Sequence, residues 1–453
     1  MEEIKTFELT REFADSLKTA IERGDNDFIL QSLEGVNPAD ITETLEEFTT
    51  DESRYILTLL DTQIGADIIS NLEEDTLKKF LRVFTPKEIA AYIDLIDSDD
   101  AADILNELPI KIREEVISSL SNDEKAEHIV DLMRYDEDVA GGIMAKELIK
   151  ANLNWTVEQT TEEIRNQAEN ISKIFSVYVV DDRNRLLGRV SLKKMLLARK
   201  GTLIKDIYDD DVIAIKTYDD AEEVIAAMKK YDLEAIPVVN MQNNLMGRVT
   251  IDDVVDVMTE QAEEERQLMA GISEDVEEDD SIWMQTRARI PWLIIGLIGA
   301  FFGAEVIGLF ESDIAAIPIM AAFIPLITAT AGNVAIQSSS IVVQSLANKS
   351  VFQDSTAKRL AKVVIVALIN GLLLAILAFA ISYFRRGDLT ISLIVAIALS
   401  CVVLLASLSG TITPIVLDKL DINPAAASGP FITTFNDILG LAVYFAVAYI
   451  LFQ

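Results

Sequence analysis

The stretch AAASGPFITTFNDILGLAVYFAVAYIL (425–451) decides the fold class of this chain. It is long and apolar enough to cross a bilayer as a helix, which takes roughly 20 residues. Its single charged residue, Asp437, lies about 12 residues into the stretch, near the middle of the bilayer. A carboxylate there costs on the order of 3 kcal/mol or more unless it faces water, an ion or a polar partner. The sequence therefore predicts a membrane-spanning helix with a functional acid, the alternative being a structural hydrogen bond to a neighbouring helix.

Four further apolar stretches, at about 291–310, 315–345, 360–384 and 390–416, bring the predicted spans to five. The second exceeds the thickness of a bilayer and contains Pro325 and Gly332, which predicts a kinked or tilted helix. Loops on the side of the N-terminal residues would carry seven Lys or Arg residues, against two on the other side. The positive-inside rule then places the N-terminal residues in the cytosol and Gln453 outside.

Polar side chains recur at helical spacing inside the spans. The second span carries a stripe on one helix face: Asn333, Gln337, Ser340 and Gln344. Neutral oxygen donors suit a hard cation, so these residues are expected to line a pore, with hydrogen bonds between helices as the alternative. The last span places Thr433, Gly440 and Tyr444 on the face of Asp437. The fourth span has a weaker set of the same kind: Ser400, Ser407 and Thr411.

The charge is concentrated before the spans. Residues 1–282 hold 66 acidic and 30 basic side chains, a net charge of −36, whereas residues 283–453 hold 8 and 9. Such acidity argues against nucleic acid and anionic lipid surfaces as partners and favours cations. Glu305 lies in the first span and is expected to be buried by position, toward the outer side, with its role left open; Glu311 and Asp313 are expected at the outer mouth of the spans.

Residues 1–135 show helical spacing of Leu and Ile and almost no strand pattern. A short motif recurs at residues 39–41, 66–69, 102–105 and 126–129, in the form Ala, then Asp or Glu, then an apolar residue within two positions. This repetition predicts stacked short helices, as in a solenoid. The only histidine, His128, lies in the last copy and is expected to be a partly exposed structural residue.

A stronger repeat follows at residues 136–258. YVV (178–180) and GRVS (188–191) match PVV (237–239) and GRVT (247–250) at a constant offset of 59 residues. Each copy predicts a strand, a turn, a second strand and a helix. The pair resembles tandem CBS (cystathionine beta-synthase) domains, which often bind adenine nucleotides through Thr-x-x-Asp. Thr250 and Asp253 match that pattern in the second copy, and an ordinary helix start with Thr and Asp is the alternative.

An acidic segment, residues 259–282, connects this pair to the spans. Its beginning continues a helix that starts near Val254. Like charges beneath a pore repel one another, by roughly 1 to 4 kcal/mol per pair at ~4 Å, unless cations neutralise them. The chain has one cysteine, Cys401, and lacks the Walker A, His-Glu-x-x-His and Gly-x-Ser-x-Gly motifs, so no enzyme activity is expected.

The order of these parts is specific, and the whole chain resembles the MgtE family of magnesium channels. AGNVAIQSSSIVVQSLA (331–347) and NPAAASGPFITTFNDILG (423–440) carry the resemblance most closely. It implies a multidomain integral membrane protein with an all-α domain (1–135), an α/β CBS pair (136–258), the connecting segment (259–282) and five transmembrane helices (283–453). It also implies a homodimer in the bacterial inner membrane, in which two copies of Asp437, with Thr433 nearby, hold one Mg²⁺ ion.

The resemblance further implies that intracellular Mg²⁺ closes the pore by bridging acidic residues of the soluble domains. By family position, the residues concerned are Asp67, Asp99, Asp103, Asp220, Asp232, Asp253, Asp256, Glu264 and Glu265. The expected ligands are therefore Mg²⁺, both as transported ion and as regulator, and ATP or another adenine nucleotide if the Thr250 site is used. A secondary Mg²⁺ transporter and a non-conducting metal or nucleotide sensor are the alternatives.

Overall fold

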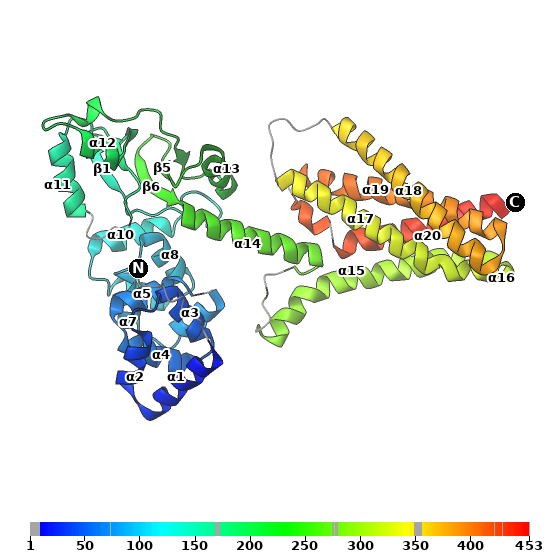
Figure 1. The fold of residues 1–453 in the computed structure, drawn as a ribbon, viewed down its shortest axis with the longest axis horizontal. Coiled ribbons are helices and arrows are strands. Elements are labelled where there is room, and N and C mark those ends of the chain that lie inside the picture. Colours follow the sequence, from blue (N-terminus) through cyan, green and yellow to red (C-terminus); the bar gives the residue numbers. More distant parts are fainter. Residues whose placement is uncertain are drawn as a thin grey trace, which may run out of the picture. The chain divides into compact units, whose positions relative to one another are not determined.

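The computed structural model describes residues 10–72, 74–167, 173–273, 276, 280–347, 356–420, 422–427 and 429–452. The chain divides into two compact units, Met1–Met258 and Thr259–Gln453 (Figure 1). The first holds an all-α part followed by two small sheets with helices, and the second holds five long apolar helices. The predicted fold class is confirmed.

Short helices, each of 8 to 13 residues, form the all-α part. Polar residues fix where several of them begin: Thr49 and Thr85, for example, each form a capping box with the glutamate three residues later. The helices are α1 (Arg11–Arg23), α2 (Asn26–Leu33), α3 (Pro38–Glu46), α4 (Thr50–Leu59), α5 (Thr62–Ser70), α6 (Glu74–Leu81), α7 (Pro86–Ile93), α8 (Ser98–Asn106), α9 (Ile110–Ile117) and α10 (Asp123–Leu132).

The recurring motif of this part marks the positions that enter its core. Its isoleucines, Ile41, Ile68, Ile104 and Ile129, are at most 3% exposed and belong to one hydrophobic cluster. The helices that carry the motif pack against one another, α3 on α5, α5 on α8 and α8 on α10. The short repeat therefore stacks helices around a shared core, as predicted for a solenoid-like domain.

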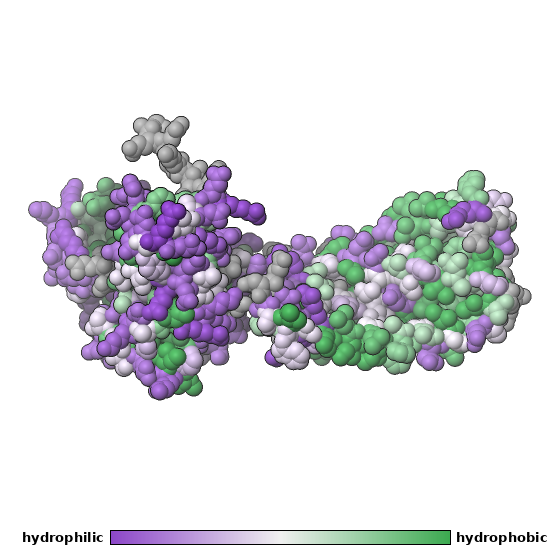
Figure 2. All heavy atoms as spheres, turned by 90° about the horizontal axis from the view of Figure 1, so that it is seen from below, coloured by the Kyte–Doolittle hydropathy of each residue, from purple (hydrophilic) through white to green (hydrophobic). Residues whose placement is uncertain are grey.

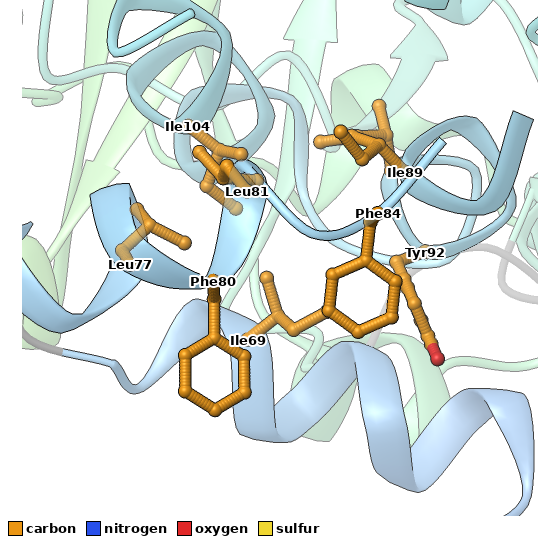
Figure 3. Close-up of a pocket in the computed structure, with 9 residues that line it drawn as sticks. Ile69, Leu77, Phe80, Leu81, Phe84, Ile89, Tyr92 and Ile104 are labelled. Atoms are coloured by element: carbon orange, nitrogen blue, oxygen red, sulfur yellow. The ribbon is translucent and has the colours of Figure 1, made fainter. Parts of the chain in front are cut away.

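Aromatic side chains complete this core between α5, α6 and α7 (Figure 3). The ring of Phe84 meets Tyr92 edge to face, with centroids 5.9 Å apart, and stacks against Phe80 at 6.5 Å. The gap that these rings enclose with Ile69 and their aliphatic neighbours is only about 10 Å³, less than a ligand needs. It is a packing defect of the core.

The two CBS copies form two three-stranded sheets of the same topology. In each sheet the middle strand is parallel to the first and antiparallel to the third, in the orders β1-β2-β3 and β4-β5-β6. The elements are β1 (Ile149–Asn152), α11 (Val157–Gln167), β2 (Val177–Val180), β3 (Leu186–Val190), α12 (Leu192–Leu197), η2 (Ile204–Asp206), β4 (Ile215–Lys216), α13 (Ala221–Tyr231), β5 (Ala235–Val239), β6 (Leu245–Thr250) and α14 (Ile251–Ala270).

The repeat becomes an approximate two-fold axis at the two hairpin turns. Asn184 and Asn243, 59 residues apart, both adopt left-handed backbone conformations, which asparagine tolerates in turns. The Asn184 amide donates to the carbonyl of Leu245, and the Asn243 amide donates to the carbonyl of Leu186, each at 3.0 Å. The two copies therefore exchange equivalent hydrogen bonds and form one module.

The glycines of the repeated Gly-Arg-Val motif are required by close backbone contacts. A Cβ atom at Gly188 would lie 2.1 Å from the carbonyl oxygen of Asp209, and one at Gly247 would lie 2.6 Å from that of Ala145. In each copy a neighbouring segment therefore lies close beside the third strand and pairs with the arginine that follows the glycine. The identical glycines in the sequence reflect this shared packing requirement.

The second unit consists of long apolar helices. Five of them have the length and hydropathy to cross a membrane. Its elements are α15 (Ile282–Leu309), α16 (Glu311–Ala316), η3 (Pro318–Phe323), α17 (Ile324–Ala347), α18 (Thr356–Arg386), α19 (Leu389–Asp418), η4 (Pro424–Ala427) and α20 (Pro430–Phe452). Figure 2 shows large apolar areas on the visible surface of this unit, and leucines and isoleucines of α18 that are more than half exposed agree with it. Such a surface requires lipid or another protein around it.

Two spans begin later than the sequence suggested. In the long second stretch the candidate span begins at Pro318, where the 3₁₀ turn η3 opens, and the α-helix α17 starts at Ile324. In the last stretch η4 precedes a break, and α20 starts at Pro430, a residue suited to the first turn of a helix. The acidic segment predicted from Val254 to about Met269 is a continuous helix, α14, which spans the boundary between the units.

Candidate cation site

Asp437 lies seven residues after the first residue of α20. At ~1.5 Å per residue this is roughly 10 Å into the span, shallower than expected from a span that started at residue 425. The side chain is half-buried, and no described residue donates a hydrogen bond to it or forms an ion pair with it. A carboxylate among apolar helices without a partner is costly, so the site favours an ion or ordered water beside it.

Gly332 of α17 faces this carboxylate. A Cβ atom at Gly332 would lie 3.5 Å from Asp437 Oδ1 and 2.9 Å from the methyl carbon of Thr433. The absence of a side chain thus lets α17 approach α20 at the level of the acid, which a sequence reading of Gly332 as a kink did not anticipate. Thr433, predicted beside Asp437, does lie on this face.

We predict that Gly332→Ala lowers cation flux about tenfold, or ~1.4 kcal/mol, because the added methyl group presses on Thr433 and narrows the space at Asp437. The fold should tolerate the change, since a threonine methyl group can turn away. Gly303→Ala is the matched control, because its Cβ would meet only Leu441, at an ordinary 3.7 Å. Equal flux in the two variants would show that α17 and α20 do not form the site.

The predicted pore-lining stripe lies on the outer face of α17 in the single chain. Asn333, Gln337 and Gln344 are exposed and Ser340 is half-buried. Among the described residues, Asn333 and Gln337 have no hydrogen-bond partner. Polar amides on an otherwise apolar helix do not face lipid without cost, so this face requires water, an ion or another polar surface.

Several other predicted polar residues are used for packing instead. Tyr444 is fully buried and its hydroxyl donates to the carbonyl of Met320 at 3.0 Å, so it does not line the path of Asp437. Gly440 packs closely on Ala331 of α17. The weaker set in the fourth span is likewise structural: Ser400 bonds to the backbone of α18, Ser407 is buried, and Thr411 bonds to the carbonyl of Ser407. Helical spacing predicted a shared face but not which neighbour covers it.

The acids near the membrane ends are exposed where they are described. Glu305 in α15 and Glu311 in α16 are exposed, and the side chain of Asp313 lies outside the described ones. Glu305, expected to be buried by its position in the first span, is therefore exposed in the single chain.

In the first unit, Met1–Met258, called the soluble unit below, acidic residues from two distant stretches of sequence lie close together. We call this set the α8–α14 acidic cluster: Asp97, Asp99, Asp100, Asp253 and Asp256. Burial and the charges of other members, among them Asp253 of α14, raise the pKa values of Asp99 and Asp100 of α8. Asp99 is 8% exposed, and its buried Oδ1 atom has no hydrogen-bond partner among the described residues. Glu147 lies beside the cluster, where it accepts hydrogen bonds from Ser98.

Burial is the main cause of the perturbed acidity of this cluster. Burial and the charges of Asp253 and Asp100 raise the pKa of Asp99 well above its ordinary value. Burial, with Asp253 as the largest charged contributor, raises the pKa of Asp100 to about 7. Burial also raises the pKa of Asp253 to about 6, although hydrogen bonds from Thr250 oppose it. Such a site gains from a proton or a cation that removes the repulsion.

The predicted regulatory acids are only partly brought together. Asp99, Asp253 and Asp256 belong to the cluster, whereas Asp97 and Asp100, visible in the run DSDD (97–100), were missed. Asp220 and Asp232 lie at opposite ends of α13, roughly 18 Å apart, too far to share one ion. Asp67 accepts a hydrogen bond from Gln63. Asp103 is exposed on α8, and its charge also raises the pKa of Asp100, so it lies at the edge of the cluster. The remaining predicted acids, Glu264 and Glu265, are exposed or half-exposed on α14.

The described carboxylates of this unit are not arranged as a metal site. Within the described residues, no three Asp, Glu, His or Cys side chains are placed to hold a metal ion. The predicted nucleotide residues also have a local role, because the Asp253 carboxylate accepts hydrogen bonds from the backbone N–H and the hydroxyl of Thr250, both at 2.8 Å. This is the capping arrangement of an ordinary helix start. Both predictions therefore remain predictions.

The raised pKa values predict how stability depends on pH. Between about pH 4 and pH 7 the folded cluster binds more protons than the unfolded chain, so the free energy of unfolding falls as pH rises. We expect the soluble unit of the full-length protein, without divalent ions, to melt several degrees higher at pH 5.5 than at pH 8 in scanning calorimetry. Asp100→Asn should reduce this difference. Stability that increases with pH over the same range would contradict the assignment.

The site and fold together define a multidomain membrane protein, in which acidic domains precede a helix bundle with an unpaired carboxylate. Comparison with known proteins agrees. Residues 324–447 match a family of divalent cation transporters, residues 36–138 the MgtE intracellular N domain, and residues 137–201 and 204–260 the CBS domain.

Whole-length relatives extend the match. The chain is 32% identical to the magnesium transporter MgtE of Enterococcus faecalis, over 90% of this chain and 95% of the relative. It is 28% identical to that of Thermus thermophilus, over 98% and 100%. The chain belongs to the MgtE family of magnesium transporters.

Solved structures match the soluble unit. A cytosolic domain of the Mg²⁺ channel MgtE in complex with ATP is 31% identical, with a TM-score of 0.51, over 54% of this chain and 99% of that one. The soluble part of a magnesium transporter is 28% identical, with the same score, over 55% and 98%.

Proposed function

We propose that this protein is a Mg²⁺-selective channel for magnesium uptake that closes when intracellular Mg²⁺ binds its acidic domains. The observation that supports the pore most directly is Asp437, a half-buried acid without a described partner on an apolar helix, facing Gly332. Mg²⁺ gives up water reluctantly and is usually held by one or two carboxylates while it keeps several waters. A single acid beside a small residue leaves room for a hydrated ion.

A homodimer would complete this pore. Asn333 and Gln337 are exposed on α17 in the single chain, where a second copy would cover them from lipid. A two-fold axis near this face would bring two Asp437 carboxylates to one ion. Two acids compensate the charge of a divalent cation. The amide oxygens of α17 can accept hydrogen bonds from the waters bound to the ion.

The proposed location is the bacterial inner membrane, with residues 1–282 in the cytosol and the C-terminus outside. The excess of Lys and Arg in the loops of one side supports this orientation. The membrane potential then drives uptake, since it supplies ~2.3 kcal/mol per elementary charge per 100 mV, and about twice as much for a divalent ion.

Repulsion within the α8–α14 acidic cluster supplies a gate that senses Mg²⁺. The cluster contains acids of α8 in the all-α domain and of the first turns of α14, the helix whose residues cross from the first unit into the second. A bound cation would lower the repulsion and hold α8 and α14 together, whereas its loss would favour their separation. Since the described carboxylates do not form a finished metal site, side chains must rearrange when the ion binds.

Flux measurements test the whole proposal. Reconstituted wild-type protein should carry Mg²⁺ into liposomes at rates above those of a carrier, with Mn²⁺ and Co²⁺ as competing ions. Slow, saturable exchange coupled to Na⁺ or H⁺ would favour a secondary transporter. No flux under any condition would favour a membrane-anchored metal or nucleotide sensor.

The gate gives a separate prediction. We expect wild-type flux to fall at least tenfold as Mg²⁺ on the soluble-domain side rises to millimolar levels. In Asp99→Asn/Asp253→Asn this dependence should be largely lost, because both the repulsion and the ligands are reduced. Asp27→Asn, which removes an exposed acid of the same unit, is the control. Full Mg²⁺ inhibition in the double variant would exclude the cluster as the sensor.

ATP binding is also proposed for the soluble unit, from its likeness to a cytosolic domain that was solved in complex with ATP. Thr250 and Asp253 are the candidate ribose contacts, and their capping hydrogen bonds would have to open or be shared with the nucleotide. Thr250→Val should weaken ATP binding measured by calorimetry, while the fold is retained.

A further inference from the structure

The residue beside the proposed ion ligand is also polar, and it faces another helix. Asn436 is 1% exposed, and its Oδ1 atom accepts a hydrogen bond from the Ser409 hydroxyl of α19 at 2.6 Å. Its amide nitrogen donates to the carbonyl of Ile432, one turn earlier in α20, at 2.8 Å. The Asn436 side chain thus bonds both to α19 and to its own helix, and it is directed toward α19.

Helix geometry links this contact to Asp437. Successive residues on an α-helix point about 100° apart, so a side chain at 436 directed to α19 sends the side chain at 437 to a different face. That face is the one met by Gly332 of α17. The Ser409–Asn436 hydrogen bond therefore fixes the rotation of α20 that aims its carboxylate away from α19 and past α17.

A small rotation of α20 about its axis moves the Asp437 carboxylate appreciably. With a side-chain atom ~6 Å from the helix axis, a rotation of about 10° displaces it by ~1 Å. Mg²⁺ requires near-octahedral oxygens at 2.0–2.1 Å, whereas Ca²⁺ accepts 2.3–2.6 Å and irregular geometry. Such a displacement of the carboxylate oxygens therefore disfavours Mg²⁺ more than it disfavours Ca²⁺.

Other contacts of α20 do not replace this one. The Tyr444 hydroxyl bonds to Met320, but Tyr444 lies seven residues beyond Asp437, roughly 10 Å along the helix. Gly440 packs on α17 and α19, and Thr434 packs on α15, through backbone and methyl groups. At the level of Asp437, Ser409–Asn436 is the side-chain hydrogen bond that joins α20 to a neighbouring helix among the described residues.

We infer that Asn436 and Ser409 are positioning residues that determine the Mg²⁺ selectivity of the site at Asp437 by fixing the rotation of α20. This inference rests on the proposed channel function. The pair is expected to contribute little to stability, since hydrogen bonds between membrane helices are weak on average. Its main effect is on which ion the carboxylate accepts.

The test compares ion fluxes in liposomes for Ser409→Ala and Asn436→Leu. Both variants should lose at least fivefold in the ratio of Mg²⁺ to Ca²⁺ flux and should require a higher Mg²⁺ concentration for half-maximal flux. Ser409→Thr, which keeps the hydroxyl, should retain the wild-type ratio. Ser407→Ala is the matched control, because Ser407 is a buried serine on the same helix and has no hydrogen bond to α20 among the described residues.

The outcomes separate the two ideas. Wild-type protein that carries no Mg²⁺ would overturn the proposed function itself. Wild-type flux with an unchanged Mg²⁺ to Ca²⁺ ratio in Ser409→Ala would overturn the positioning role, even if the melting temperature fell. If Asn436→Leu does not fold, the milder Ser409→Ala and Ser409→Thr pair still decides the question.

Discussion

Replacing Asp437 with asparagine should reduce Mg²⁺ flux by ~100-fold or more, equivalent to ~2.7 kcal/mol or more in the barrier to permeation. The substitution keeps the size of the side chain but removes the charge that would hold a divalent ion at membrane depth. The carboxylate has no described protein partner, so its loss breaks no ion pair of the single chain. The melting temperature should therefore be unchanged or higher, because burying an amide costs less than burying a charge.

The control variant is Asp388→Asn. Both variants should be measured for ⁴⁵Ca²⁺ flux and, with an indicator dye, for Mg²⁺ flux. Asp388 caps the start of α19 by accepting a hydrogen bond from the backbone N–H of Ile391. Asparagine caps a helix equally well, so this control removes a carboxylate from the same unit without changing the fold. A conducting Asp437→Asn channel that still selects Mg²⁺ would exclude Asp437 as the ion ligand.

The second large effect is expected from Gly410→Ala in α19. A Cβ atom at Gly410 would lie 2.4 Å from the carbonyl oxygen of Ala335 and 3.0 Å from its Cα atom, both in the backbone of α17. Backbone cannot rotate away as a side chain can, so the two helices must separate. Small residues at such crossings allow membrane helices to approach closely, and their enlargement removes the packing that holds the bundle together.

We expect Gly410→Ala to cost about 1 to 3 kcal/mol, as overpacking does, and to lower the melting temperature of the membrane unit by several degrees. Flux should fall at least tenfold, because α17 carries both Gly332 and the polar stripe. Gly296→Ala is the control: its Cβ would meet no atom within 4 Å, and alanine favours a helix by ~1 kcal/mol. Equal stability of the two variants would show that the contact of α17 and α19 is not tight.

Parts of the fold were predictable because repeated spacings of residues along the chain indicate which positions are buried. The repeat at an offset of 59 residues predicted two equivalent sheet modules, and the reciprocal bonds of Asn184 and Asn243 are its structural counterpart. The recurring Ile of the all-α domain was predicted from spacing, since each helix needs one apolar face. The ends of spans were less predictable, because a proline-led 3₁₀ turn is as apolar as the helix that follows it.

The site was predictable only in part. Asp437 stands out in the sequence because a single charge in an apolar stretch is costly wherever that stretch lies in the membrane. Tyr444 has the same helical spacing as a pore residue, yet it is buried against Met320. Asp100 carries no sequence signal that distinguishes it from its acidic neighbours. Its raised pKa comes from burial in the folded chain and from the charge of Asp253, more than 150 positions away.

The sequence by itself determined that the chain has an acidic soluble part, a CBS pair and five membrane-spanning helices with one acid at depth, because composition and periodicity act locally along the chain. Only the tertiary structure decided which polar side chains face one another. It placed Asn436 against Ser409 and Asp437 against Gly332, and it brought Asp99 close to Asp253. These pairings depend on helix rotation and on contacts between distant segments, which no local pattern encodes.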